Sequence, residues 1–253
     1  MDSAVDTKTR NSLVTFLLLT FGVSSVSYAR IFAGAPLAQV VSWLMWTPGV
    51  AAIVTQLLFY RTVAGLGWRP GPLRYLALAA LLPIAYGVAI YVPVWLTGLG
   101  RFDGTVVRRA LPVVPIAALD TLVRALGEEI GWRGFLAPAF YRARGFGWAG
   151  IGTGILWGLW HVPLIVSGGY EAGTPAWYGI SCFMISVTAM AVMIAWLRLR
   201  SGSLWTATVF HGVHNLFIQG IFDPSTIDTG VVVPGAVRAP LCATCTIVTL
   251  PAT

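Results

Sequence analysis

The chain of 253 residues is 57% hydrophobic and only 10% charged, and its mean hydropathy is +0.79. A soluble domain carries about 25% charged residues, so this composition excludes an ordinary soluble enzyme or binding module. The formal net charge of +7 does not indicate nucleic-acid binding, because basic residues cluster in short segments between apolar runs, as membrane topology requires.

Six apolar runs contain no charged residue, and each has about the length that a helix needs to cross a bilayer core. We therefore predict an all-α, polytopic transmembrane bundle of about seven to eight spans. The expected spans are 12–30, 37–60, 75–97, 110–127, 148–167, 176–197 and 203–222. Residues 230–253 form either a last span or a poorly defined tail, and the whole chain, 1–253, reads as a single integral membrane domain.

The basic residues predict an orientation. If the spans alternate in direction, Lys8, Arg10, the 61–74 loop and the pairs at 142/144 and 198/200 all lie on one side. The opposite side carries fewer basic residues, together with several acidic ones. The positive-inside rule then places the N-terminus in the cytoplasm of a multi-pass plasma-membrane protein.

The fourth apolar element, 110–127, differs from the others because it carries charge. Asp120, Arg124 and Glu128 follow each other at intervals of four residues and so form one stripe along a helix. Such a stripe cannot face lipid, and we expect it to face the bundle interior or water. Ionisable groups at membrane depth mark a functional site by default.

Two adjacent carboxylates at the end of this stripe are expected to have different roles. On a helix, Glu129 and Arg133 lie one turn apart and can form an ion pair. Glu128 is turned about 100° away and is left to face another direction. A carboxylate in a partly dry pocket is a stronger base than one in water, so Glu128 is a candidate general base.

All three histidines of the chain lie in the two apolar segments 145–170 and 201–222. Pro163 is expected to bend the first of these segments beside His161. His211 and Asn215 share one helix face, and His214 is adjacent to that face. Each of these side chains could simply bridge two spans by a hydrogen bond, but together we expect them to face Glu128, with His214 the least secure.

Three ordered motifs resemble those of the CPBP family, which contains the CAAX prenyl protease type 2 and the bacteriocin-processing or self-immunity membrane proteins. They are Glu128-Glu129 with Arg133, Trp157 with His161 and Pro163, and His211 with Asn215. The resemblance covers about residues 110–222, which would be the protease-like core. One departure is that Trp157 stands where the family motif has Phe, which keeps an aromatic residue.

The resemblance implies an intramembrane endopeptidase that hydrolyses a peptide bond of a membrane-associated protein or peptide, prenylated or bacteriocin-like. Glu128 would activate water, His161 and His211 would position the water or the substrate carbonyl, and Asn215 would donate to the oxyanion. Glu129, Arg133 and Trp157 would support them. Pairing of Arg124 with Glu128 would weaken the base. The site is expected to open toward the cytoplasmic leaflet.

Cofactor use is left open by the sequence. Glu128, His161 and His211 could supply a zinc site with one open position for water. The His-Glu-x-x-His helix of many zinc proteases is absent from the sequence, however, so no cofactor is favoured and zinc is the alternative.

Three alternative functions share the same residues. The charged groups could form a purely structural ion network. A proton-coupled transporter also places Asp, Glu and His within its spans, although the two similar halves expected of one are not apparent. A non-enzymatic immunity or scaffold protein would keep the motifs without turnover.

Overall fold

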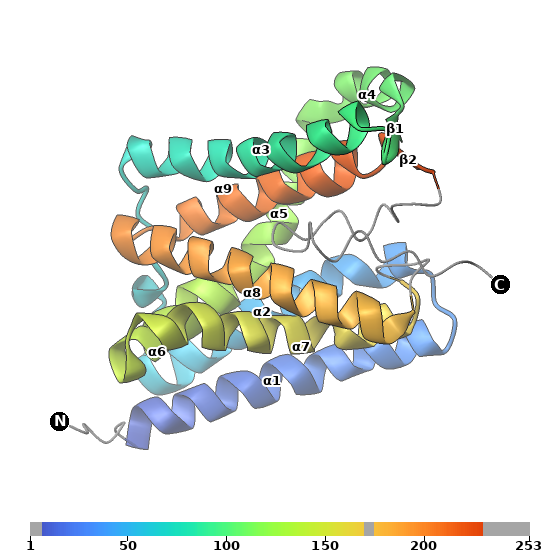
Figure 1. Cartoon of the computed structure of the whole chain (residues 1–253). Coiled ribbons are helices and arrows are strands. Elements are labelled where there is room, and N and C mark those ends of the chain that lie inside the picture. The colour runs from blue at the N-terminus through green and yellow to red at the C-terminus, as the bar shows by residue number, and fades with distance from the viewer. Residues whose placement is uncertain (1–6, 170–174, 230–253) are drawn as a thin grey trace.

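The computed structural model describes residues 7–169 and 175–229, and this part of the chain is a bundle of long helices (Figure 1). Six of its helices are long and apolar enough to cross a membrane. The predicted all-α, polytopic architecture is therefore confirmed. The possible span at 230–253 lies outside the described residues.

The six candidate spans follow the apolar runs of the sequence closely. Three are single helices in the first half of the chain, two are composite helical runs, and one is the long helix α8. They are α1 (Thr7–Phe32), α2 (Leu37–Tyr60), α3 (Leu73–Leu96), Gly104–Arg144, Trp148–Val166 and α8 (Ala176–Ser201).

The seventh expected span is a helix, but its composition sets it apart. It consists of α9 (Leu204–His214) and its continuation η5 (Asn215–Phe222). It is not among the helices that are apolar enough to be candidate spans. Its histidines, asparagine and glutamine lower its mean hydropathy. Instead of facing lipid on all sides, α9 packs against α3, α5 and α8.

The two composite runs each contain several helical segments. The first comprises α4 (Gly104–Ala110), η2 (Leu111–Val113), α5 (Val114–Glu129), η3 (Ile130–Leu136) and α6 (Ala137–Arg144), and the second comprises η4 (Trp148–Gly152) and α7 (Thr153–Val166). The segments η3, η4 and η5 are wound as π-helix, which periodicity does not predict. Such wider turns often occur at functional sites.

Glycines allow α2 to cross α5 and η3 with their backbones in contact. A Cβ atom on Gly131 would lie 2.5 Å from the Cβ of Pro48, and one on Gly49 would lie 2.4 Å from the carbonyl oxygen of Gly127. Pro48 lies inside α2, and Pro48 and Gly49 are both at this crossing. The close approach holds the end of α5, with its two glutamates, deep in the bundle.

The ends of the bundle differ in what they contain (Figure 1). One end, the basic end, holds the starts of α1, α3 and α9, the ends of α2 and α8, and α6 with the short helix η1 (Ala64–Leu66). The other end holds α4 and two short strands, β1 (Gly100–Phe102) and β2 (Thr226–Asp228). We call it the hairpin end, after the antiparallel pair that these two distant strands form.

The strands form an antiparallel pair that the sequence did not predict. Gly100 pairs with Asp228 and Phe102 with Thr226. The indole of Trp95 donates a 2.9 Å hydrogen bond to the hydroxyl of Thr226, and the hydroxyl of Tyr91 donates to Asp223. These contacts fix the end of η5 against α3.

Candidate functional site

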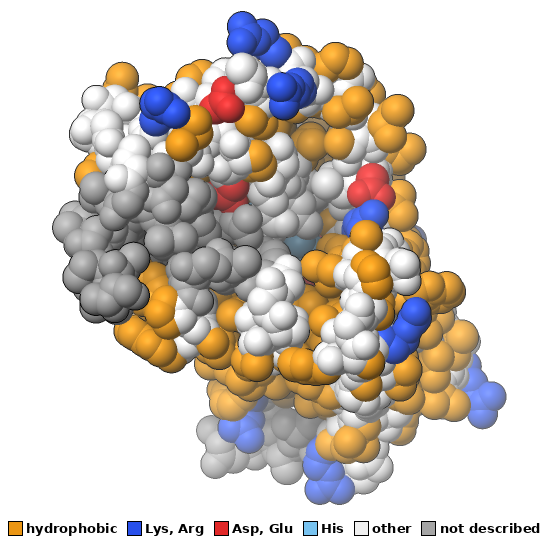
Figure 2. Space-filling model, turned by 90° about the vertical axis from the view of Figure 1, so that its right-hand side faces the viewer, with side chains coloured by type: hydrophobic (Ala, Val, Ile, Leu, Met, Phe, Trp, Pro, Cys, Tyr) orange, Lys and Arg blue, Asp and Glu red, His pale blue; other side chains and the backbone are white. Residues whose placement is uncertain are grey.

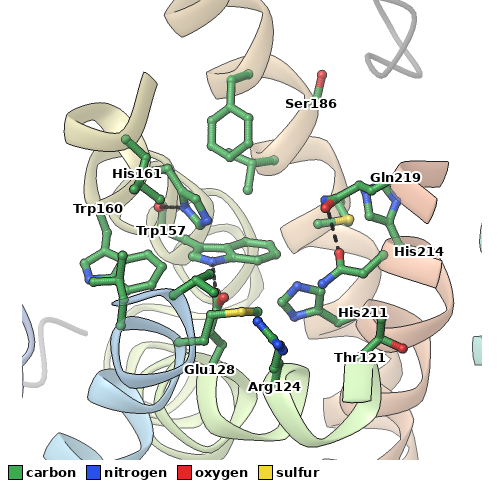
Figure 3. Close-up of a pocket in the computed structure, with 18 of the residues that line it drawn as sticks. Thr121, Arg124, Glu128, Trp157, Trp160, His161, Ser186, His211, His214 and Gln219 are labelled. Carbon is green, nitrogen blue, oxygen red and sulfur yellow. Dashed lines mark hydrogen bonds between the residues drawn. The ribbon is translucent and has the colours of Figure 1, made fainter. Parts of the chain in front are cut away.

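The predicted site residues meet at a cavity of about 450 Å³ between α2, α5, α7, α8, α9 and η5 (Figure 3). Five of them line it: Glu128, Trp157, His161, His211 and Asn215. The supporting pair, Glu129 and Arg133, lies behind this wall, with both side chains fully buried.

Glu129 connects three elements. Its Oε1 accepts a hydrogen bond from Nη1 of Arg133 at 2.8 Å, as the four-residue spacing predicts. The same oxygen lies 2.9 Å from Nδ1 of His211 on α9. The sequence did not predict this second contact, which gives Glu129 a direct role in orienting a histidine of the site.

Glu128 points into the space above α5, toward α7 (Figure 3). Its side chain is 1% exposed, and the indole N–H of Trp157 donates to its Oε2 at 2.6 Å. The other oxygen, Oε1, has no hydrogen bond to another described residue. Phe at position 157 could not make this contact, so the departure from the family motif adds a donor to the proposed base.

The charged stripe on α5 faces the cavity, as expected, but its members do not all pair with one another. Asp120, Arg124 and Glu128 all line the cavity. Nε of Arg124 lies 2.8 Å from Asp120, whose side chain is 54% exposed. Among the described residues Arg124 pairs with Asp120 and makes no ion pair with Glu128.

Hydrogen bonds fix the tautomers of two histidines. Nδ1 of His161 lies 2.9 Å from the carbonyl oxygen of Trp157, and Nδ1 of His211 faces the Glu129 carboxylate. A carbonyl or an ionised carboxylate can only accept, so each Nδ1 carries the hydrogen. In the neutral rings both Nε2 atoms are therefore acceptors.

Asn215 and His214 have different partners on the same helix. Oδ1 of Asn215 accepts a 3.2 Å hydrogen bond from Gln219, which leaves the amide N–H₂ of Asn215 as its donor. His214 also lines the cavity, and its Nδ1 shares a hydrogen bond with the hydroxyl of Tyr86 on α3. His214 therefore makes a hydrogen bond between two helices, α9 and α3, which is the alternative role that the sequence analysis gave for it.

Aromatic side chains of the motifs and of other helices hold the site in place. The Arg133 guanidinium lies 4.1 Å from the centroid of the Trp157 ring. The ring of Phe183 on α8 lies 4.9 Å from that of His161. Trp160 of α7 also lines the cavity, and its indole donates to Ser24 on α1 at 2.7 Å. For Phe183 and Trp160 the sequence offered only hydropathy, which does not separate them from ordinary packing.

The cavity does not open at the end that we expected. From Glu128 it runs past Asp120, the first turns of α2 at Leu37, Cys182 near the start of α8, and Gly220. All of these lie toward the hairpin end, and Figure 2, which views the molecule from that side, shows a histidine at the bottom of a hollow. The expectation that the entrance and the N-terminus share one side is therefore wrong. The cause is that α5 enters the bundle from the hairpin end and carries Glu128 only halfway across.

The donor set shares one feature with a metal site. The Nδ1–H tautomer of His161 and His211 is the one that a ligating histidine uses. However, no group of three or more His, Cys, Asp or Glu side chains in the described residues is arranged to hold a metal ion. Zinc on Glu128, His161 and His211 stays the alternative prediction.

Comparison with known proteins matches the region that carries these motifs. Residues 110–217 match the model of the family described as type II CAAX prenyl endopeptidase Rce1-like. The family resemblance is confirmed over this region. The Rce1-like segment thus runs from the end of α4 into η5. It includes the predicted site residues Glu128, Glu129, Arg133, Trp157, His161, His211 and Asn215.

A curated relative supports the same assignment. The chain is 35% identical over 126 residues to a protein of Methanococcus maripaludis named CAAX prenyl protease 2. This match covers 47% of the chain and 46% of the relative, so the chain spans about half the length of the relative it matches.

Proposed function

We propose that the protein is an intramembrane endopeptidase in which Glu128 activates water to cleave a peptide bond of a membrane-associated substrate. The observation that carries the proposal is the division of labour between the two glutamates. Glu129 is engaged by Arg133 and His211, whereas Glu128 lines the cavity and has one oxygen held by Trp157. The Rce1-like match supports the same reaction class.

The first chemical step is attack on the scissile carbonyl. A water molecule between Oε1 of Glu128 and a histidine Nε2 gives one proton to the carboxylate, and its oxygen bonds to the carbonyl carbon. The amide of Asn215 donates to the resulting oxyanion. A donor placed in this way is worth roughly 3 kcal/mol of transition-state stabilisation.

The second step breaks the carbon–nitrogen bond of the tetrahedral intermediate. Glu128 returns its proton to the leaving amine, and the oxyanion collapses to a carboxylic acid. Throughout, Glu129 keeps the Nδ1 hydrogen of His211 in place, so that Nε2 faces the reacting groups. Arg133 balances the charge of Glu129, and its position over Trp157 holds the indole against the base.

The orientation of the bundle decides from which side a substrate arrives. Nine of the sixteen basic residues belong to the basic end: Lys8, Arg10, Arg61, Arg69, Arg74, Arg142, Arg144, Arg198 and Arg200. The positive-inside rule places this end, and the N-terminus with it, in the cytoplasm. The cavity then opens on the opposite side of the plasma membrane. The substrate class that suits this arrangement is a membrane-associated peptide whose cleavage site is exposed outside the cytoplasm.

The test compares Glu128→Gln with the matched variant Glu129→Gln in purified protein, using cleavage of a panel of membrane peptides and melting in detergent. Glu128→Gln keeps the size of the side chain and removes the base. We expect a loss of cleavage of about 10²–10⁴-fold with an unchanged melting temperature. Glu129→Gln leaves Arg133 buried without its counter-charge, and we expect it to lose about 3–5 kcal/mol of stability.

Cleavage by Glu128→Gln at the wild-type rate would show that the base is wrong. A wild-type protein that cleaves no peptide of the panel, while both variants behave as described in melting, would favour the immunity or scaffold function.

A second measurement concerns the cofactor. We propose a reaction without metal, and therefore expect purified protein to contain less than stoichiometric zinc and to keep its cleavage activity in EDTA. Loss of activity in EDTA that added zinc restores, but magnesium does not, would replace the proposed mechanism by one with zinc on Glu128, His161 and His211.

A further inference from the structure

A second cavity, at the basic end, is lined by two arginines and by no acidic residue. It has a volume of about 370 Å³ and lies between the connection from α2 to α3 and the turn from α8 to α9. Its lining consists of Ala64, Gly65, Gly67, Trp68, Arg69, Arg198 and Gly202. None of these residues contributes to the endopeptidase cavity described above.

Arg198 is buried in this cavity wall without a counter-ion. Its side chain belongs to the last turn of α8 and is 7% exposed. Among the described residues its one hydrogen bond is from Nη2 to the carbonyl oxygen of Leu66 at 3.3 Å, and its Nε has no partner. No ion pair of the described chain includes it. A buried guanidinium normally pairs with an anion, because desolvation of its charge is costly.

The surroundings add positive charge instead of balancing it. Arg69 lines the same cavity from an exposed position, and Arg142 on α6 is close enough for its charge to act on Arg198. The described acidic side chains belong to the middle of the bundle or to its hairpin end, as the positions of α5, α4 and η5 show (Figure 1). The potential in this cavity is therefore strongly positive.

The connection around the cavity is fixed in shape by its own contacts. Gly67 has a φ of +91°, and a Cβ atom there would lie 2.5 Å from Nη2 of Arg198, so only glycine lets the backbone rest on the guanidinium. The carbonyl oxygen of Gly67 accepts from the amide of Leu204 at 2.8 Å. The carbonyl oxygen of Trp68 accepts from the indole of Trp205 at 2.8 Å. The arginines are thus presented by a rigid frame.

We propose that this cavity, which we call the arginine cradle, binds a phosphate group, with Arg198 and Arg69 as its ligands. A guanidinium offers a planar set of donors that matches a phosphate, and Arg198 has used only one of its donors. Basic pockets between helices near the cytoplasmic surface bind the headgroups of anionic phospholipids. The phosphate of such a lipid, or free phosphate, supplies the counter-charge that the protein lacks.

The test uses the full-length protein and phosphatidylglycerol as the lipid probe. Retention of phosphatidylglycerol against phosphatidylcholine is measured by native mass spectrometry, and its stabilising effect by melting in mixed micelles. The variants are Arg69→Ala and Arg198→Gln, with Arg200→Ala as the matched control. Arg200 is exposed on the same helix end but does not line the cradle. Arg69 is exposed, so its replacement leaves folding intact even where Arg198→Gln fails to fold.

We expect Arg69→Ala to weaken retention of phosphatidylglycerol about fivefold, as the loss of one basic contact predicts. Arg198→Gln should weaken it more, and Arg200→Ala by less than twofold.

Inorganic phosphate forms the second arm of the experiment. If it raises the melting temperature of wild type but not of Arg69→Ala, and no lipid is retained, the ligand is free phosphate. Equal retention in wild type and Arg69→Ala, with no effect of phosphate on either, overturns the proposal. So does an equal loss in all three variants, because that is general surface electrostatics.

Discussion

At the scale of single residues, Trp157 joins the two halves of the site. Its indole nitrogen donates to Glu128, its ring face lies against Arg133, and its carbonyl oxygen sets the tautomer of His161. The ring also meets that of His211 edge-on, at 5.2 Å between centroids. One side chain therefore contacts the base and the buried ion pair together.

Replacement of Trp157 separates these contributions. Trp157→Phe restores the aromatic residue of the family motif and removes the indole donor. We expect cleavage to fall about 10–100-fold, the effect of losing one hydrogen bond to a charged group, which is worth about 1.5–3 kcal/mol. Trp157→Ala also removes the ring from Arg133 and both histidines, and should lose about 3–5 kcal/mol of stability with most of the activity. Peptide cleavage and detergent melting measure both effects. Equal losses in the two variants would mean that the ring contacts are unimportant.

At the scale of elements, the crossing of α2 over α5 and η3 sets the depth of the glutamates. The backbones touch at Gly49, Gly127 and Gly131, where no side chain fits between them. Any substitution that separates the two helices also moves Glu128 and Glu129 relative to α7 and α9.

A pair of alanine variants tests the crossing. Gly131→Ala places a Cβ atom 2.5 Å from Pro48, and we expect it to cost about 1–3 kcal/mol of stability together with cleavage activity. Gly22→Ala is the matched control, since nothing lies within 4 Å of a Cβ atom at that helical position. It should be neutral or stabilising by about 0.5–1 kcal/mol, the usual gain of alanine over glycine in a helix. A stable, active Gly131→Ala protein would contradict the close crossing.

The elements also show where inference from the sequence ends. The pairing of Glu129 with Arg133 was predictable, because four residues make one helical turn. The contact of Glu129 with His211 was not, since it joins residues 82 positions apart and depends on how α9 packs against α5. The π-helical segments and the β1–β2 pair also depend on packing rather than on periodicity. Glu128, Glu129 and the histidines were predicted from charged and polar groups inside apolar segments, and the family motifs then implied their roles.

At the scale of the whole molecule, the basic residues gather at one end of the bundle and the cavity beside Glu128 opens toward the other. The basic end carries the N-terminus and the arginine cradle, whereas the cavity beside Glu128 opens toward the hairpin end. Of the first feature, the sequence predicted from charge counts that the N-terminus shares one side with most of the basic residues, but it did not predict the arginine cradle. It could not reveal the second, because the depth of Glu128 and the side from which it is reached depend on the path of α5 through the bundle.

Cysteine labelling in intact cells checks this orientation. In a chain with its three native cysteines replaced by serine, we expect Ala33→Cys to react with a membrane-impermeant maleimide before the cells are opened. Gly147→Cys, at the basic end, should react only after permeabilisation. Both positions are exposed in the described structure. The reverse pattern would place the cavity entrance in the cytoplasm and would favour cytoplasmic, prenylated substrates instead.

The composition of α9 has a consequence for how the protein is made. With two histidines, an asparagine and a glutamine in or directly after it, the helix Leu204–Phe222 is less apolar than the six candidate spans. A segment of this kind partitions poorly into lipid on its own and needs neighbours that cover its polar groups. Its neighbours α3, α5 and α8 all precede it in the chain and so leave the ribosome first. Insertion of Leu204–Phe222 and assembly of the cavity beside Glu128 are therefore expected to be one event during biogenesis. A chain that cannot form this cavity is then also unable to finish the integration of this helix.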